Sequence, residues 1–591
     1  MKKFIYNTIQ VTCFAGLLAV GACNTFEAEP LEWNLEADVT NPQDSTAINM
    51  KKLHQEIYAS LPGLHTRLSN SYLDAATDDG VPTRDKGGNG SLENYRNGNL
   101  SPENIASLDG NAWENFYKGI RRANLFLEKI EGYPSSTQLT KIEIKRMKAE
   151  ARFLRAYFYF ELMKRWGGVP LLGDRVINYD EDWNIARSSI DECAQYILDE
   201  ISEENPSSCY ADLYDVEEMP EDMVGRMNKG AAKALYSRLK LYLASPLYNS
   251  DNVQSKWQEA ADAAKAVIDM GVYDLHYTAE KKEEDTADPT PGFLALFGDN
   301  ASFTTLNKET IMMKEAAGNT SLESDNSPCG YQRNKCKGLT SPSQNLVDAF
   351  LMLDGKRIGD PTSKYKYDPQ NPYANRDPRL AHTVFCNGDI WLKRPVETFN
   401  GGLDRSSKPG LFTTQTGYYL RKFLGLNETK ADNSGFNGAY HHYQIFRYAE
   451  ILLNYAEALN EVGGDETEIE NCLIQLRKRA GIEPSDDGRY GLPTGYSRQE
   501  MREIIRNERR IELAFEEHRF WDIRRWKIAE DVMNEPVKGV EIYKQADGSF
   551  LYNYDVVVRT SVFDERMYWY PIPRGEMNGN TKLTQNPGWN Y

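Results

Sequence analysis

Beyond its first two dozen residues, the sequence contains no apolar run approaching the length of a membrane-spanning helix. Such a helix needs about 20 consecutive apolar residues, so we expect none in the body of the chain. Basic residues are also in deficit, because 69 Lys and Arg stand against 87 Asp and Glu and the formal net charge is −18. Since phosphate contacts depend on basic patches, this balance argues against a nucleic-acid ligand.

Cysteine is also scarce, with 8 residues in the 591-residue chain. Cys13 and Cys23 fall in the N-terminal segment, and the remaining cysteines show neither CxxC spacing nor histidine partners at zinc spacing. We therefore expect neither a metal site nor a cofactor. Cys329 and Cys336 lie close together in a Gly- and Pro-rich loop and could close it as a disulfide in an oxidising compartment.

The N-terminus has the layout of a secretory signal. Lys2 and Lys3 form a short positive region that precedes an apolar segment, and small residues then lead into Val20-Gly21-Ala22-Cys23. This ending resembles the lipobox of bacterial lipoproteins, in which the signal peptide is removed before a cysteine that carries acyl chains. We expect a lipoprotein signal peptide at residues 1–22 and lipidation of Cys23. An ordinary cleaved signal with a chance cysteine is the alternative.

The residues after the cysteine are typical of a tether. They are polar and acidic, contain Pro30 and Pro42, and show little periodicity. One acyl chain holds a protein only marginally on a membrane, whereas two or more hold it stably. We expect residues 23–48 to form a lipidated tether that is anchored in outer-membrane lipid through acylated Cys23.

Amphipathic helices dominate the rest of the chain. Apolar side chains recur at steps of three and four residues, which is the helical period, in the segments 101–131, 140–166, 225–245, 254–270, 443–462, 466–480 and 497–528. Small Ala residues beside large Tyr and Leu, in pairs of about 34–40 residues, resemble tetratricopeptide units. Such pairs bury one face only when they stack on neighbours. The sequence predicts a mainly α fold, in which helix pairs form a right-handed superhelical scaffold with long irregular loops and a few short strands.

The helical pattern fades between residues 272 and 442, where Gly, Pro, Asn, Thr and Ser increase. Residues 309–314 and 418–423 are the short segments that favour strands. Long irregular stretches inside a compact protein are usually functional or disordered, and the many aromatic residues here argue against disorder. We therefore expect a ligand-binding loop region at residues 272–442.

Several sequence blocks follow one another in a specific order. They are AEARFLRAYFYF (149–160) with RWGGVPL (165–171), NRDPR (375–379), FRYAEILLNYAEA (446–458), RNERRIELAFE (506–516) with RFWDIRRW (519–526), and YPIP (570–573) with QNPGW (585–589). These blocks resemble the SusD/RagB family of nutrient-uptake lipoproteins of Bacteroidetes. The individual blocks have moderate specificity, and their order along the chain is highly specific.

The resemblance implies a role rather than a reaction. Proteins of this family are lids on a SusC-like TonB-dependent outer-membrane transporter, and they bind glycan at the cell surface and hand it over. We therefore expect an outer-membrane lipoprotein that faces the cell exterior and captures oligo- or polysaccharide, and we expect it not to be an enzyme. The implied fold is a single SusD-like domain at residues 49–591, with an N-terminal part at about 49–271 and a C-terminal part at about 272–591.

The resemblance also implies ligand-binding residues. The run Asp…Val-Pro-Thr-Arg is similar to the family segment that carries the acid and the arginine of a starch-type site. The residues carried over from it, with neighbours that could grip adjacent hydroxyl groups, are Asp78, Arg84, Asp79 as the alternate acid, Tyr95 and Asn97. A loop-fixing ion pair is the structural alternative. No tryptophan follows the arginine before Trp113, so starch itself is not the expected ligand.

Aromatic residues of the irregular region are candidates for a sugar platform, because a pyranose presents an apolar face that stacks on a ring. Trp391 follows a turn signal at Asn387-Gly388-Asp389, so it could be displayed at a loop edge or packed beneath it. The candidates are Phe297, Tyr331, Trp391 and Tyr418. The alternative for each is an ordinary core position.

Other functions stay open at this stage. A peptide or another nutrient could be the ligand. A glycoside hydrolase would need two carboxylates at a set separation, and a protein-interaction scaffold would need no sugar site. The Arg- and Glu-rich segment 506–526 favours a salt-bridged helix with ion pairs at i,i+3 and i,i+4 rather than a catalytic cluster. We expect its Ile511, Phe515 and Trp526 to pack inward.

Overall fold

The computed structural model describes residues 46–590, except for positions 64, 66, 69–70, 84–89, 137, 179–180, 221–224, 277–292, 294–295, 298–306, 317–319, 332–335, 393, 406–412 and 426–439. The expected signal peptide, Cys23 and most of the tether lie outside the described residues.

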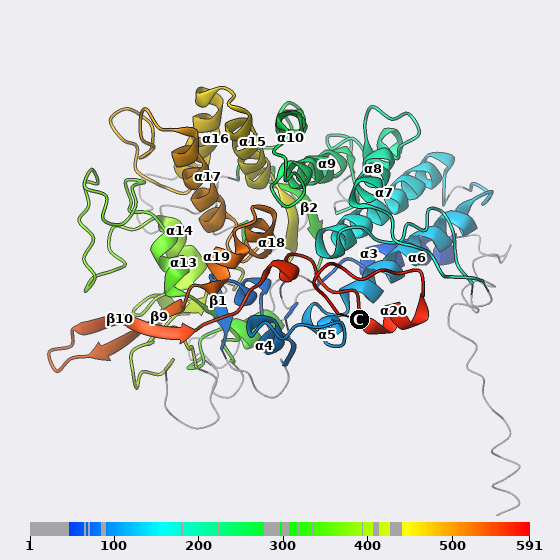
Figure 1. Cartoon of the computed structure of the whole chain (residues 1–591). Helices are drawn as coiled ribbons and strands as arrows, with labels where there is room; N and C mark the ends of the chain where they lie inside the picture. Colours follow the sequence, from blue (N-terminus) through cyan, green and yellow to red (C-terminus); the bar gives the residue numbers. More distant parts are fainter. Residues whose placement is uncertain are drawn as a thin grey trace, which may run out of the picture.

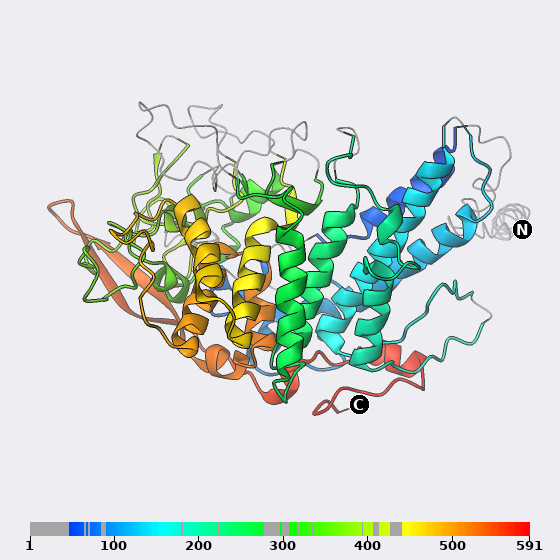
Figure 2. The same cartoon turned by 90° about the horizontal axis from the view of Figure 1, so that it is seen from above.

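Long helices lie side by side in a row that follows the chain from its N-terminal to its C-terminal part (Figures 1 and 2). Successive helices of the row from α3 to α10 pack on one another, α10 also packs on α15, and both α16 and α17 pack on α15. The two halves of the chain are therefore joined across the irregular region. These helices are α3 (Ile48–Ala59), α6 (Ala112–Ile130), α7 (Lys141–Trp166), α8 (Ile190–Ile201), α9 (Lys229–Ala244), α10 (Gln254–Ile268), α15 (Tyr448–Val462), α16 (Glu466–Arg479) and α17 (Arg498–Glu512).

Local sequence signals explain where several of these helices begin and end. Ser189 caps α8 and Ser497 caps α17, and in each case the glutamate three residues later completes a capping box. Such boxes satisfy two backbone N–H groups that the helix itself leaves unpaired. Gly463 ends α15 in a left-handed conformation with φ of 78°, which glycine adopts without steric cost.

Shorter helices connect the row to the loops. They are α4 (Gly90–Arg96), α5 (Ile105–Leu108), α12 (Ser321–Asn326), α13 (Gln344–Ala349), α14 (Pro378–Thr383), α18 (His518–Arg525), α19 (Ala529–Asn534) and α20 (Arg574–Gly579). Single 3-10 turns occupy Leu73–Ala76, Tyr210–Asp212 and Glu565–Tyr568.

The described strands form two-stranded antiparallel pairs only. The pairs are β1 (Gly80–Pro82) with β3 (Thr340–Pro342), β2 (Thr310–Lys314) with β8 (Tyr443–Arg447), β4 (Val384–Phe385) with β7 (Tyr419–Leu420), β5 (Ile390–Trp391) with β6 (Arg394–Pro395), and β9 (Val537–Lys544) with β10 (Phe550–Arg559). The β9–β10 hairpin projects from the body (Figure 1). The predicted mainly α fold with a few short strands is confirmed.

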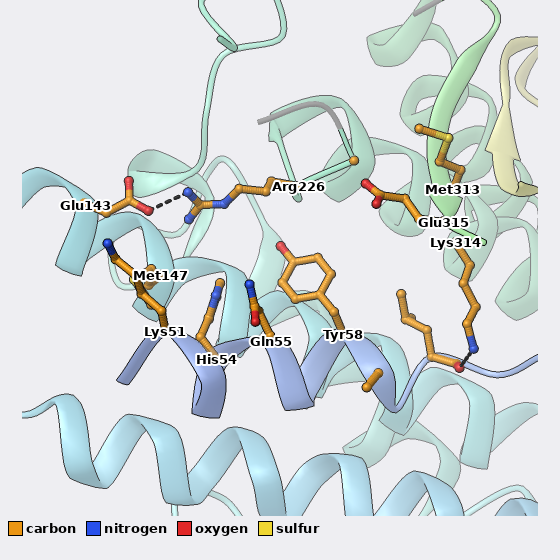
Figure 3. A pocket seen from close by; sticks show the side chains of 13 residues that line it. Lys51, His54, Gln55, Tyr58, Glu143, Met147, Arg226, Met313, Lys314 and Glu315 are labelled. Atoms are coloured by element: carbon orange, nitrogen blue, oxygen red, sulfur yellow. Dashed lines mark hydrogen bonds and ion pairs between the residues drawn. The ribbon is translucent and has the colours of Figure 1, made fainter. Parts of the chain in front are cut away.

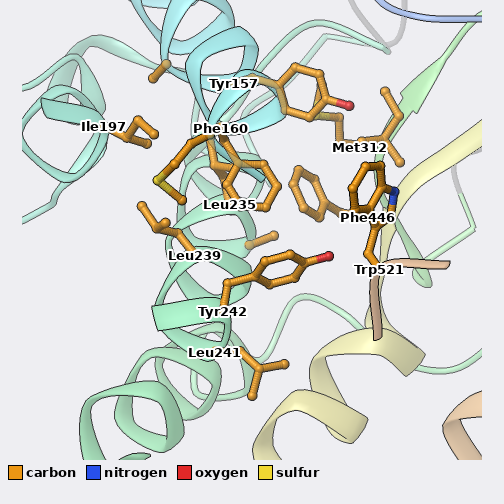
Figure 4. Close-up of a cluster of buried hydrophobic side chains, with 14 of the residues drawn as sticks. Tyr157, Phe160, Ile197, Leu235, Leu239, Leu241, Tyr242, Met312, Phe446 and Trp521 are labelled. Atoms are coloured by element: carbon orange, nitrogen blue, oxygen red, sulfur yellow. The ribbon is translucent and has the colours of Figure 1, made fainter. Parts of the chain in front are cut away.

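Two apolar cores hold the chain together. The larger core lies among the helices, where side chains from α7, α9, β2, β8 and α18 meet around Tyr157, Phe446 and Trp521 (Figure 4). The smaller core lies under the irregular region and includes β4, β5 and β7. Because elements from both halves contribute to the larger core, we expect neither half to bury its apolar face alone.

Four sequence predictions of element boundaries were wrong. The predicted helix 101–131 is divided into α5 and α6, since Gly110 and Asn111 adopt left-handed φ values of 56° and 55°. The predicted helix 497–528 is divided into α17 and α18, since Phe515 and Glu517 have φ values of 61° and 63°. The predicted helix 443–462 begins as strand β8, because its first residues pair with β2. The predicted strand 418–423 is shortened to β7.

Candidate ligand-binding site

The two acids that the sequence suggested for ligand contact are buried in ion pairs. Both Arg510 and Arg519 contact Asp78, at 2.7 Å and 2.9 Å, and Arg510 Nε also donates to Asp79 Oδ1 at 2.7 Å. Although burial opposes ionisation of Asp78, the two guanidinium groups lower its pKa to about 2. Burial raises the pKa of Asp79. These pairs connect β1 to α17 and α18, so both acids hold β1 in place.

Of the remaining residues of this segment, the structure describes Tyr95 and Asn97. Tyr95 is buried, and its hydroxyl accepts a hydrogen bond from Arg524 Nη2 at 2.6 Å. Asn97 is exposed at the end of α4. Arg84 lies outside the described residues.

The four aromatic candidates pack inside the smaller core, which is the alternative stated for them above. Their side chains are 0–4% exposed, so in this structure none presents a ring face to solvent. Their polar atoms have partners inside the core: Tyr331 donates to the Trp391 carbonyl at 2.8 Å, and Tyr418 donates to Gln344 Oε1 at 2.6 Å. The Phe297 ring meets Phe423 edge to face at 5.1 Å.

A cleft of about 560 Å³ opens instead between α3, α7 and the end of β2 (Figure 3). One wall is a single face of α3, because Lys51, His54, Gln55 and Tyr58 have the helical spacing i, i+3, i+4 and i+7. The facing walls come from α7, from β2 and from the segment before α9, and they contain Glu143, Met147, Gly225, Arg226, Met313, Lys314 and Glu315.

A buried carboxylate links three of the residues that line this cleft. Glu150 contacts His54 at 3.2 Å and Arg226 at 2.6 Å, and it accepts a hydrogen bond from the Tyr58 hydroxyl at 2.7 Å. Burial opposes its ionisation, but His54 and Arg226 lower the pKa of Glu150 overall. Burial and the charge of Glu150 raise the pKa of Tyr58. The phenol is therefore a neutral, fixed donor, and its half-buried ring forms part of the wall.

The cleft can bind a polar molecule through several kinds of contact. The Tyr58 ring and the thioethers of Met147 and Met313 offer apolar surface, while Lys51 and Gln55 carry polar groups at the opening. An apolar floor with a few convergent polar groups is the usual composition of a small-ligand site.

A second hollow of about 450 Å³ adjoins the cleft and shares Ala59, Leu61 and Lys314 with it. It lies between the end of α3 and the beginning of α6. Lys314 stands between the two hollows, and its ammonium group donates a hydrogen bond to the Leu61 carbonyl (Figure 3). We call the two hollows together the α3 groove.

Comparison with known proteins identifies the family. A model described as the SusD family matches residues 308–589, and a model described as starch-binding and associating with the outer membrane matches residues 35–243. This chain belongs to the SusD family.

Relatives in the SusD family cover nearly the whole chain. The SusD-like protein P38 of Formosa agariphila is 24% identical over 556 residues, which cover 91% of this chain and 95% of the relative. A crystal structure of a SusD-like protein from Bacteroides fragilis is 26% identical, with a TM-score of 0.73, and the match covers 92% of this chain and 98% of that one. A SusD-like carbohydrate-binding protein from the same species is 24% identical, with a TM-score of 0.72 and coverages of 91% and 99%.

Three of the blocks that resemble the SusD family meet in one buried ion-pair network. Glu512 in α17 contacts Arg379 at 2.9 Å and Arg447 at 2.8 Å, and it also pairs with Arg479. Burial opposes its ionisation, but the three guanidinium groups lower the pKa of Glu512. The interpretation of α17 as a salt-bridged helix is confirmed, although these partners are remote in sequence rather than at i,i+3 and i,i+4. Its Ile511, and Phe515 and Trp526 beyond it, are buried as expected.

Three further properties concern the described part of the chain. No cluster of three or more His, Cys, Asp or Glu side chains there is arranged to hold a metal ion. No helix in these ranges combines the length and the apolar character that a membrane crossing needs. Cys329 and Cys336 are both buried.

The α3 groove was not predicted from the sequence. A signal for α3 was present, since Met50, Leu53 and Ile57 have helical spacing and are buried. The polar face of α3 could also have been read from the sequence. The opposite wall could not, because β2 lies about 250 residues further along the chain and tertiary packing alone brings it there.

Proposed function

We propose that this SusD-family protein binds an oligo- or polysaccharide at the cell surface and delivers it to a SusC-like TonB-dependent transporter. The observation that carries the proposal is the match of the two family models to both parts of the chain. The carbohydrate-binding relative of known structure, with its similar fold, supports a glycan as the ligand. The α3 groove supplies a place with both apolar and polar contacts.

Lipidation of Cys23 and a tether up to residue 48 would hold the protein on the outer membrane, facing the cell exterior. A second contact region in the proposal is the segment after β1, with Arg84 and Asn97. The buried pairs of Asp78 and Asp79 support this indirectly, because they fix the strand from which that segment starts.

Binding without hydrolysis is consistent with the ion pairs that two carboxylates at the cleft make. Glu143 at the cleft rim pairs with Arg226 at 2.5 Å, and Glu150 is held by three partners. A carboxylate whose charge is held by cations is a weak proton donor at neutral pH. The expected outcome of incubation with oligosaccharides is therefore binding without new reducing ends, and release of new ends would overturn this part of the proposal.

Affinity gel electrophoresis with a panel of neutral and acidic polysaccharides tests the binding. The double variant Lys51→Ala/Gln55→Ala should lose roughly thirtyfold in affinity, because each of the two polar contacts contributes about 1 kcal/mol. Lys52→Ala is the matched control, since Lys52 is exposed on the same helix and does not line the cleft. Equal retardation of both variants would remove the cleft from the proposal.

The transporter is tested separately. Affinity purification of the lipidated protein from detergent-solubilised outer membranes of its host should recover a TonB-dependent transporter, identified by mass spectrometry. Recovery of the protein alone under mild detergent would count against delivery through such a partner.

A further inference from the structure

The second hollow of the α3 groove has an unusual charge for this protein. Its lining contains four cationic side chains and a single carboxylate, Asp109, whereas the whole chain carries a formal charge of −18. The cations are Arg67, Lys118, Arg122 and Lys314. We call this second hollow the basic pocket.

Among the residues that the structure describes, only part of this positive charge is compensated. Arg67 contacts Asp109 at 2.8 Å and Glu517 at 2.6 Å, and Asp109 is shared with Arg165. The Nη2 atom of Arg67 is buried and has no hydrogen-bond partner. Its side chain is only 5% exposed, so the guanidinium group is a fixed positive wall of the pocket with one unused donor.

The other cations are less well neutralised. Arg122 contacts Glu56 at 2.8 Å, but that pair is partly exposed and exposed pairs are weak. Lys314 donates to the Leu61 carbonyl, and neither it nor Lys118 has an acidic partner among the residues that the structure describes. A carbonyl oxygen carries no net charge, so the charge of Lys314 is uncompensated there.

The surroundings of Lys314 disfavour its charged form, and a bound anion would offset this effect. Burial, and then the charge of Arg67, lower the pKa of Lys314. Bringing a negative group into the pocket would return favourable Coulomb energy to an ammonium group that has lost part of its hydration. The net negative charge of the protein repels anions in general. A basic hollow would therefore attract anions at one place on an otherwise acidic protein.

The remaining wall offers polar contacts to a sugar. Ser60 and Asn115 add hydrogen-bonding groups, whereas the Phe116 ring is buried. The volume of about 450 Å³ lies in the usual range for small-molecule sites, about 300–1,000 Å³. The basic pocket also continues into the cleft past Lys314, so a chain of sugar units could occupy both hollows of the α3 groove.

We propose that the basic pocket binds a carboxylate- or sulfate-bearing sugar unit, and that the glycan captured by this protein is therefore acidic. This inference rests on the proposed function and adds the substrate class to it. Lys118 and Lys314 would contact the acidic group, while Arg67 would contribute its field from the wall.

Isothermal titration calorimetry on the purified protein tests the inference with matched ligands. Uronic-acid oligosaccharides are compared with their carboxyl-reduced forms, and sulfated oligosaccharides with their desulfated forms. We expect at least one acidic ligand to bind at least tenfold more tightly than its neutral counterpart, with an affinity that falls as salt screens the charges. The ligand pair that shows this difference in affinity identifies the acidic group as a carboxylate or a sulfate.

Substitutions then locate the site. Lys118→Gln should weaken binding of the acidic ligand about tenfold, the usual effect of one charge-assisted hydrogen bond, and Lys118→Arg should retain it. Lys118 is exposed on α6, so the variant keeps the fold. Lys478→Gln, at an exposed position of α16, is the matched control that should bind normally.

The outcomes separate the two proposals. Equal affinity for acidic and neutral forms, or unchanged binding by Lys118→Gln and Lys314→Gln, would overturn the acidic-sugar inference and leave glycan capture standing. If no glycan of either kind binds, the proposed function fails as well.

Discussion

Asp74 is a buried carboxylate whose ionisation should destabilise the folded protein. It lies in the 3-10 turn Leu73–Ala76 and is 1% exposed. Its Oδ1 accepts a hydrogen bond from the Phe515 backbone N–H at 3.0 Å, and its Oδ2 has no partner. Burial, and then the nearby charge of Asp79, raise the pKa of Asp74 to about 8. We expect Asp74→Asn to stabilise the protein at neutral pH.

The sign and size of the stabilisation expected for Asp74→Asn follow from proton linkage. The pKa of Asp74 is about 8 in the folded state, against a value of 3.8 for the unperturbed group, so the folded state keeps a proton that the unfolded state releases. Stability is therefore lost as pH rises from about 4 to about 8, at up to about 1.4 kcal/mol per pH unit. At pH 7 the accumulated loss in the free energy of unfolding would be about 4 kcal/mol. An unpaired amide N–H₂ in the variant costs about 1 kcal/mol, which leaves a gain of about 3 kcal/mol.

Urea denaturation followed by tryptophan fluorescence measures this difference. At pH 4 the variant and the unmodified protein should differ little, because this pH is close to the unperturbed pKa of 3.8 and only about 0.6 kcal/mol of the penalty has developed. At pH 7 the denaturation midpoint of the variant should lie higher. Asp555→Asn, at an exposed position of β10, should show no such pH dependence. A variant that is less stable at pH 7, or equally shifted at both pH values, would refute the reasoning.

Three further outcomes are expected. Glu512→Gln should lower the free energy of unfolding by about 3–5 kcal/mol, because it leaves buried guanidinium groups without their shared partner; an unchanged thermal midpoint would contradict this. Arg84→Ala should weaken glycan binding in calorimetry while circular dichroism stays native, and an unchanged affinity would remove Arg84 from the site. Cys23→Ala should leave the protein in the soluble fraction after membrane sedimentation, whereas continued sedimentation with membranes would exclude acylation of Cys23 as the anchor.

The buried ion pairs give a structural reason for the sequence blocks that resemble the SusD family. Arg379, Arg447 and Glu512 come from three separate blocks, and each buries a charge that is tolerated only with its partner in place. Such residues specify how the C-terminal helices meet the irregular region. These residues do not contact the α3 groove and carry no information about the ligand. The fold could therefore be predicted from the sequence in more detail than the site.

The sequence by itself determined the elements whose signals are local. The apolar period placed α7, α9, α10 and α16 within a few residues of their observed bounds, and the Ser497–Glu500 capping box marks the beginning of α17. Local signals suffice here because a helix makes its hydrogen bonds between residues close in sequence.

Tertiary structure alone decided the rest. The helical pattern continues through Phe515 and Glu517, yet the chain breaks there, and the partners of this segment, Asp74 and Arg67, lie more than 400 residues away. Trp391 follows a turn signal but is buried, because it packs in the smaller core with residues from other parts of the irregular region. The α3 groove likewise exists only where α3 meets β2. Burial and charge pairing between distant segments depend on which surfaces come together in space, and periodicity along the chain does not contain that information.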